Sequence, residues 1–307
     1  MEKGSPVSKG MRSENRVRKW FHQIRGPFLI LSVVLVLIGV AAAFHEGFRN
    51  WGHGLLLMVG VVLAHVSVNL FNELSDYRTK IDEMTVRTPF SGGSGLLQGG
   101  KTSPRAVKIA AYGALIGAAG IGFYFCVVVG WFILVFMITG GLAARFYTSY
   151  LARWLLGEFV AGLTLGIFVV LGGYYVLTGT VNGAIVVISV PPGILTALLL
   201  LLNEFPDAEA DKKGGRHHLV IHFGKKRSAV IYAVGLTVVY SIVLAAPFFC
   251  SVPYTVLVAL ATLPLAIKTA AVVLKHPDDT ARLIPALGLN VLVVILTDLL
   301  LAVGFFV

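Results

Sequence analysis

Two short stretches of acidic and amide side chains share one spacing, and their residue types suit a divalent cation. The pattern Asn-Glu-x-x-Asp occurs at Asn72–Asp76 and again at Asn203–Asp207, 131 residues later. Asp82 follows the first copy and Asp211 follows the second. Mg²⁺ prefers oxygen ligands and commonly bridges one or two carboxylates to the phosphates of a substrate. The two motifs therefore predict a site for a metal and a phosphorylated substrate.

The charges in and around these motifs support that interpretation. Eight of the fifteen acidic residues fall in the two stretches, and facing carboxylates repel one another unless a cation neutralises them. Basic residues are interleaved with the acids and could hold the remaining phosphate charge. They are Arg78, Lys80, Arg87, Lys212, Lys213 and Arg216. A charged loop that merely positions helix ends would explain one such motif, but it explains two matching motifs less well.

The elements that must position these motifs are long and apolar. Of 307 residues, 57% are hydrophobic and only 13% are charged, and the mean hydropathy is +0.85. A soluble domain carries about 25% charged residues. Nine apolar runs approach the roughly 20 residues that cross a bilayer: 27–44, 54–74, 105–128, 131–148, 156–178, 182–203, 228–247, 252–274 and 283–306. We therefore predict an all-α, polytopic membrane protein with nine transmembrane helices in a bundle.

The positions of Lys and Arg predict how this bundle is oriented. With the N-terminus inside, 24 of the 25 basic residues fall on one side of the membrane, and only Arg49 falls on the other. Cytoplasmic loops carry such an excess. We expect a multi-pass protein of the cell inner (plasma) membrane, with residues 1–26 as a basic cytoplasmic tail. A cleaved signal peptide is the alternative, but the leading region is long for that role. The basic residues that give the net charge of +10 lie in the gaps between apolar runs and form no patch of their own, so they do not indicate nucleic acid binding.

The repeated motif also predicts how the chain is organised. The copies lie four spans apart and on the same face of the membrane, as a duplicated four-helix unit would place them. We expect a single transmembrane domain over 27–307, with pseudo-repeats of about 27–148 and 156–274 and a ninth helix. In the second span His65, Asn69, Asn72 and Asp76 share one helix face. Polar groups that face lipid are costly, so this face should point into the bundle.

These residues resemble the UbiA superfamily of intramembrane prenyltransferases, whose members have nine transmembrane helices and two Asp-rich motifs after the second and sixth. The resemblance covers nearly the whole chain in order and spacing. The first motif, followed by Arg87-Thr88-Pro89 and Leu97-Gln98-Gly99-Gly100, looks most like enzymes that prenylate 1,4-dihydroxy-2-naphthoate in menaquinone biosynthesis, a quinone pathway. So do the second motif, Tyr147-Thr148 and Gly157-Glu158.

The chain departs from the family pattern at three places near the motifs. Glu73 stands where the family usually has Asp, and Glu204 stands where that branch often has Asn. His217-His218 replaces a more usual small polar pair. A Glu can still hold a metal, so the departures bear on the acceptor more than on the reaction.

The resemblance implies a Mg²⁺-dependent transfer of a polyprenyl group from polyprenyl diphosphate to an aromatic acceptor in the membrane lipid. The expected metal ligands are Asp76, Asp82, Asp207 and Asp211, supported by Asn72 and Asn203, while the basic residues named above hold the diphosphate. The C–O bond ionises to an allylic cation, which the acceptor ring attacks. Asp76 and Asp207 are expected to be catalytic, and Tyr147 could offer the cation a π face.

Several alternatives remain open at this stage. The acceptor could instead belong to a lipid ether, tocopherol-type or heme pathway. A membrane transporter is less compatible, because the repeat is parallel and its acids lie at helix ends. Ser91–Gly95 is expected to cover the site as a flexible cap. Glu73 and His65 have no assigned role, and Asp298 in the last span is expected to make a structural hydrogen bond to Thr or Asn neighbours.

Overall fold

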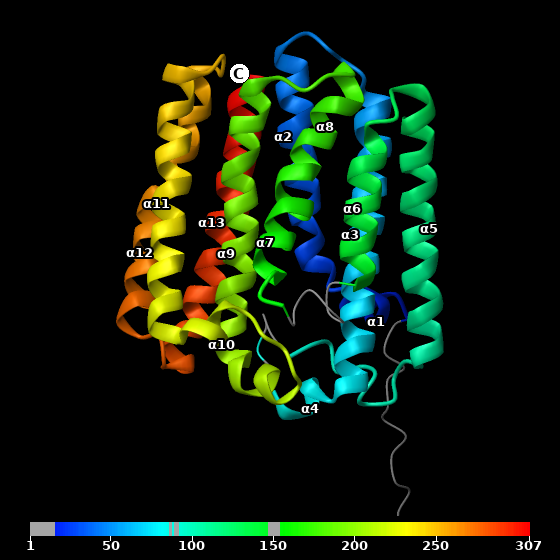
Figure 1. Cartoon of the computed structure of the whole chain (residues 1–307), viewed down its shortest axis with the longest axis vertical. Coiled ribbons are helices and arrows are strands. Elements are labelled where there is room, and N and C mark those ends of the chain that lie inside the picture. The colour runs from blue at the N-terminus through cyan, green and yellow to red at the C-terminus, as the bar shows by residue number, and fades with distance from the viewer. Residues whose placement is uncertain (1–15, 86–87, 89–91, 147–153) are drawn as a thin grey trace, which may run out of the picture.

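The chain folds into a bundle of long helices (Figure 1). A computed structural model describes residues 16–307, with gaps at 86–87, 89–91 and 147–153. The described residues contain helices and no strand, which confirms the predicted all-α class. In chain order the elements are α1 Arg16–Gln23, η1 Gly26–Leu29, α2 Ile30–His45, α3 Trp51–Thr79, α4 Ile81–Met84, α5 Pro104–Val128, α6 Ile133–Phe146, α7 Gly157–Ala161, η3 Gly162–Ile167, α8 Phe168–Thr178, α9 Gly183–Lys213, α10 Leu219–Phe223, α11 Lys225–Phe249, η4 Tyr254–Thr262, α12 Leu263–Lys275 and α13 Thr280–Phe306.

Most of these helices are long and apolar enough to cross a membrane. Within the described residues, eight helical stretches meet that condition, counting η1 with α2, α7 and η3 with α8, and η4 with α12. The described part of α6 has only 14 residues and ends where the gap at 147–153 begins. The predicted count of nine is therefore not confirmed, whereas the prediction of a polytopic membrane protein is.

Side chains that cap helix N-termini fix where several of these helices begin. The Asn50 side chain accepts a hydrogen bond from the backbone N–H of His53 at the start of α3, and Asn182 does the same for Ile185 at the start of α9. Ser103 caps α5, where Pro104 occupies the first turn. Such caps satisfy backbone donors that a helix leaves without partners.

Glycines allow the central helices to approach closely. A Cβ atom on Gly39 of α2 would overlap the backbone of α8 at Val170 and Gly173. A Cβ on Gly166 of η3 would overlap Gly193 of α9. Small residues at such crossings let membrane helices pack backbone against backbone. The six-residue π-helical turn of η3 lies at the second of these contacts.

Both motif-bearing helices extend well past their apolar runs. The apolar run of α3 ends near residue 74, but the helix continues to Thr79. The apolar run of α9 ends near residue 203, but the helix continues to Lys213. As a result, Asn72–Asp76 and Asn203–Asp211 lie on the long helices, and Asp82 lies on the short helix α4. Figure 1 places α1, α4 and α10 at one end of the bundle and the C-terminus at the other.

Candidate active site

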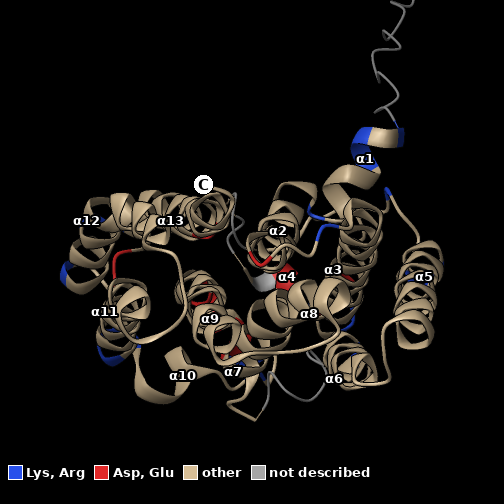
Figure 2. Cartoon of the chain, turned by 90° about the horizontal axis from the view of Figure 1, so that it is seen from above, with Lys and Arg blue, Asp and Glu red and all other residues tan. Residues whose placement is uncertain are grey.

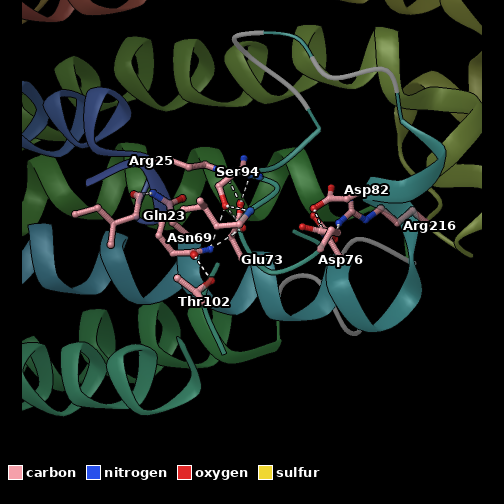
Figure 3. A network of polar contacts seen from close by, with 12 residues as sticks. Gln23, Arg25, Asn69, Glu73, Asp76, Asp82, Ser94, Thr102 and Arg216 are labelled. Atoms are coloured by element: carbon pink, nitrogen blue, oxygen red, sulfur yellow. Dashed lines mark hydrogen bonds and ion pairs between the residues drawn. The ribbon is translucent and has the colours of Figure 1, made fainter. Parts of the chain in front are cut away.

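The two acidic motifs meet on one arginine. The Arg216 guanidinium donates to an Asp211 carboxylate oxygen at 2.8 Å and also forms an ion pair with Asp76 (Figure 3). Asp76 lies in the last turn of α3 and is 5% exposed, and Asp211 lies near the end of α9 and is 2% exposed. The charge of Arg216 therefore partly neutralises two buried carboxylates that come from opposite halves of the sequence. In Figure 2 the acids of α4 and α9 lie toward the middle of the bundle, while the basic residues of α11 and α12 lie on its outer edge.

Asp82 is the third buried carboxylate of this cluster. It is 4% exposed and accepts a hydrogen bond from Nε2 of Gln98 at 2.8 Å. The backbone of Gly93 lies against its carboxylate so closely that a Cβ atom there would overlap it. Burial raises the pKa of Asp82 above its usual range, and the negative charge of Glu73 adds to that rise. A cation at this position would favour the ionised form.

Glu73 points away from this cluster and holds the glycine-rich stretch after the first motif. Its carboxylate accepts hydrogen bonds from the backbone N–H of Ser94 at 2.7 Å and from the Ser94 hydroxyl at 2.6 Å. Gln23 donates to it at 2.8 Å and accepts from Thr102 at 2.7 Å (Figure 3). Glu73 is fully buried, and Arg25 lies 3.7 Å from it. Glu73 thus ties the N-terminal segment to the glycine-rich stretch.

A largely apolar cavity of about 520 Å³ lies inside the bundle beside the motifs. Asn72 and Asn203 line it, as do Arg25, His65 and Asn69. Its remaining wall is mostly aliphatic and aromatic, with contributions from α3, α5, α6, η3, α8 and α9. The size is typical of sites for organic ligands. The expectation that the polar face of α3 points into the bundle is confirmed, because His65 and Asn69 are buried and Asn72 lines the cavity.

The remaining predicted site residues lie in different places. Asp207 lies one turn before Asp211 on α9 and is partly buried. Four of the basic residues expected to hold the diphosphate are exposed and make no ion pair with the acidic cluster within the described part of the chain: Arg78, Lys80, Lys212 and Lys213. Arg216 is the one that reaches it. Arg87 and Tyr147 lie outside the described residues.

Two buried polar residues of the spans have contrasting surroundings. The Nδ1 atom of His65 lies 2.8 Å from the Ser32 hydroxyl, so one ring nitrogen is satisfied while the side chain lines the cavity. Asp298 is fully buried, but neither of its carboxylate oxygens has a hydrogen-bond partner among the described residues. The expectation of a Thr or Asn partner for Asp298 is therefore wrong. The nearby Thr297 hydroxyl is instead shared with Thr262, at 2.7 Å.

The sequence did not reveal Gln23 as part of the site, and it did not indicate that Glu158, Glu204 and His218 lie together. The last three gather next to Asp211, with one possible ligand atom from each lying within 4.8 Å of the others. Gln23 sits at the end of a basic helix, where nothing in the local pattern marks it. Glu204 and His218 could have been suspected because both depart from the motif that the chain resembles.

Comparison with known proteins agrees with this architecture. A family model described as the UbiA prenyltransferase family matches residues 32–294. The 1,4-dihydroxy-2-naphthoate octaprenyltransferase of Bacillus subtilis is 29% identical over 218 residues, which cover 69% of this chain and 68% of that protein. The enzyme of the same name from Escherichia coli is 25% identical over 303 residues, which cover 95% of this chain and 96% of that protein.

Solved structures share the fold at low sequence identity. A UbiA homolog from Aeropyrum pernix without ligand has a TM-score of 0.70 at 16% identity, over 91% of this chain and 96% of that one. A UbiA homolog from Archaeoglobus fulgidus bound to GPP and Mg²⁺ has a TM-score of 0.59 at 14% identity, over 90% and 99%. Since the family match spans most of the sequence, this chain belongs to the UbiA prenyltransferase family and is a membrane enzyme that transfers prenyl groups.

Proposed function

We propose that the enzyme transfers a polyprenyl group from polyprenyl diphosphate to 1,4-dihydroxy-2-naphthoate, a step of menaquinone biosynthesis. The observation that carries this proposal is the meeting of Asp76 and Asp211 on Arg216, beside an apolar cavity of about 520 Å³. One end of such a site suits a diphosphate, and the other suits a prenyl chain. The names of the bacterial relatives support the naphthoate acceptor.

The carboxylates fit Mg²⁺ as the cation. Asp76, Asp82 and Asp211 offer oxygen ligands, are all buried, and come from two helix ends and α4. Arg216 supplies positive charge between Asp76 and Asp211. A diphosphate would add negative charge to this cluster, and a dication would then be needed to neutralise it. Asp76, Asp82, Asp207 and Asp211 would hold the metal, with Asn72 and Asn203 supporting. When bound, Mg²⁺ stabilises the charge on the leaving diphosphate.

The chain's own residues then divide the remaining work. Arg216 binds the diphosphate as it leaves, because a guanidinium can pair with two oxygens at once. The C–O bond of the donor breaks, and its electron pair departs with the diphosphate. A ring carbon of the acceptor bonds to the allylic carbon and then loses the group it carried, a proton or the carboxylate as CO₂, which restores the aromatic ring. Phe136 and Phe168 line the apolar part of the cavity, where they can contact the prenyl chain of the allylic cation. The apolar wall excludes water that would otherwise capture it.

We further propose that the enzyme lies in the cell inner membrane with its N-terminus in the cytoplasm. This rests on the distribution of Lys and Arg, because 24 of 25 fall on the face that carries the motifs in the topology predicted from the sequence. The charged diphosphate headgroup of the donor would then reach the motifs from the cytoplasmic side of the membrane, and so would the acceptor.

Product analysis with a panel of acceptors tests the proposal. Membranes containing the enzyme, Mg²⁺ and labelled polyprenyl diphosphate are incubated with the naphthoate, a tocopherol-type acceptor, heme or a glycerol phosphate. We expect a prenylated product by mass spectrometry with the naphthoate only. A product with another acceptor alone would assign the enzyme to a different branch, and uptake of a solute without any product would favour transport.

Matched variants test the metal site in the same assay. Asp76→Asn and Asp211→Asn should each lower the rate about 100-fold or more, because a charged ligand of the metal that stabilises the leaving diphosphate is lost. Glu83→Gln and Glu209→Gln are the controls, since these exposed acids lie in the same two stretches. Full activity of both Asp variants would contradict the metal assignment.

A further inference from the structure

A second group of possible metal ligands lies beside the acidic cluster and is not used by the proposed reaction. Glu158 comes from α7, Glu204 from α9, and His218 immediately precedes α10. One carboxylate oxygen of each glutamate and one ring nitrogen of the histidine lie within 4.8 Å of one another. The exposed fractions are 3% for Glu158, 9% for Glu204 and 2% for His218. Side chains from α7, from α9 and from the segment before α10 thus meet at one buried position.

The local fold holds each of these side chains in place. Oε1 of Glu158 accepts the backbone N–H of Leu219 at 2.8 Å, which pins the carboxylate to the start of α10. The backbone N–H of Leu155 donates to the carbonyl of His217 at 3.1 Å, so the segment before α7 is also fastened to the segment before α10. His218 occupies the cap position of α10 but makes no capping bond with its side chain. The imidazole is therefore directed elsewhere.

The atoms that face one another in this group lack hydrogen-bond partners among the described residues. They are Oε2 of Glu158, Oε2 of Glu204, and both ring nitrogens of His218. A buried polar atom without a partner is costly, and a buried pair of carboxylates is more so. Nδ1 of His218 lies 3.4 Å from Glu204, and Nε2 lies 3.4 Å from Asp211, too far for good hydrogen bonds. The geometry leaves room for a cation between these atoms.

The mixture of donors favours a transition metal over Mg²⁺. Imidazole nitrogen with carboxylates suits Zn²⁺, Mn²⁺, Fe²⁺ or Co²⁺, whereas Mg²⁺ prefers oxygen ligands alone. We propose that Glu158, Glu204 and His218 bind a first-row transition-metal dication, at a site separate from the aspartates of the two motifs. Two of the three ligands, Glu204 and His218, are positions where the chain departs from the motif it resembles.

The second nitrogen of His218 gives this site a link to the reaction centre. A histidine that binds a metal through one nitrogen commonly donates its other N–H to a carboxylate, which orients both groups. Here Nδ1 faces Glu204 and Nε2 faces Asp211. A bound metal would set the tautomer that donates to Asp211 and so orient an aspartate of the second motif. Only this link rests on the proposed function, and metal binding itself does not.

Titration with Co²⁺ tests the site without measuring activity. The purified full-length chain in detergent is titrated with Co²⁺ while visible absorption is recorded, and excess Mg²⁺ is present to fill the aspartate site. We expect cobalt d–d bands that Zn²⁺ abolishes. His218→Gln and Glu158→Gln should weaken Co²⁺ binding at least tenfold. Glu158→Gln keeps an oxygen for the Leu219 N–H, and melting curves verify that each variant is folded.

Two controls separate this site from its neighbours. His217→Gln should leave binding unchanged, although His217 and His222 form an exposed pair 3.2 Å apart that could itself bind Co²⁺. Asp76→Asn, which removes the proposed reaction, should also leave Co²⁺ binding unchanged, so the two proposals can fail independently. Absence of d–d bands, bands lost in His217→Gln but retained in His218→Gln, or bands abolished by Mg²⁺ would each overturn the site.

Discussion

Arg216 is the residue that neutralises a carboxylate from each half of the site when no metal is bound. Its side chain is 19% exposed, yet it pairs with carboxylates whose side chains are 8% and 3% exposed. Removing one partner of a buried ion pair leaves an uncompensated charge, and this costs more than the pair itself contributes. The arginine and a bound dication would therefore perform overlapping electrostatic roles around Asp76 and Asp211.

Exchange of this arginine should make stability depend on metal. We expect Arg216→Gln to lower the free energy of unfolding by about 2 kcal/mol without metal. Mg²⁺ should then raise the melting temperature of the variant more than that of the parent, because a ligand that binds only the folded state stabilises it. Differential scanning fluorimetry in detergent, with and without Mg²⁺, measures both effects. Lys212→Gln removes an exposed charge nearby and should change neither.

Single residues of this site differ in how far the sequence could reveal them. Asp76 and Asp211 could be paired in advance because their motifs match and lie on the same face of the membrane. The pairing of Glu158 with Leu219 joins positions 61 residues apart, and that of Gln23 with Glu73 joins positions 50 apart. No periodicity links such positions. They meet only because of the way in which helices pack.

The glycine-rich stretch after the first motif contacts both Glu73 and Asp82. Gly93 has φ +65° and its backbone lies against the Asp82 carboxylate, while Ser94 is bound twice by Glu73. Only a glycine combines that backbone conformation with so close an approach. The stretch therefore helps to position the Asp82 carboxylate.

A pair of glycine substitutions separates these two requirements. Gly93→Ala introduces strain from positive φ and a clash with Asp82, whereas Gly100→Ala introduces strain alone, since Gly100 also has φ +65° but faces open space. The strain costs about 1 kcal/mol in either variant. We expect Gly93→Ala to raise the Mg²⁺ concentration needed for half-maximal prenyl transfer at least tenfold. Similar Mg²⁺ requirements in the two variants would show that contact with Asp82 is unimportant.

At the scale of elements, apolar runs located the helices but not their ends. Hydropathy measures which residues suit lipid, so it stops at about residue 74 in α3, but the backbone continues helical until Lys80 adopts a left-handed conformation at φ 57°. The same holds for α9, which contains Pro206 and still runs to Lys213. The π-helical turn at Gly162–Ile167 depends on packing against Gly193 and has no local signal.

The whole molecule places the site at one end of the bundle. In Figure 1, α4 and α10 lie at the end opposite the C-terminus, and the helices that carry both motifs finish there. The internal duplication, with pseudo-repeats of about 27–148 and 156–274, remains our proposal for why matching motifs finish on one face. A parallel repeat requires an even number of spans between its copies, and it therefore makes a firm demand on the topology.

That demand can be checked with single cysteines on opposite ends of the bundle. In a background with Cys126→Ala and Cys250→Ala, Arg49→Cys lies between α2 and α3, and Lys212→Cys lies near the end of α9; both positions are exposed. A membrane-impermeant maleimide added to intact bacterial cells should label Arg49→Cys at once. It should reach Lys212→Cys only after the cells are opened, because 24 of 25 basic residues favour a cytoplasmic location for that face. Labelling of Lys212→Cys in intact cells would place the acidic cluster outside, away from cytoplasmic prenyl diphosphate, and would refute the proposed orientation.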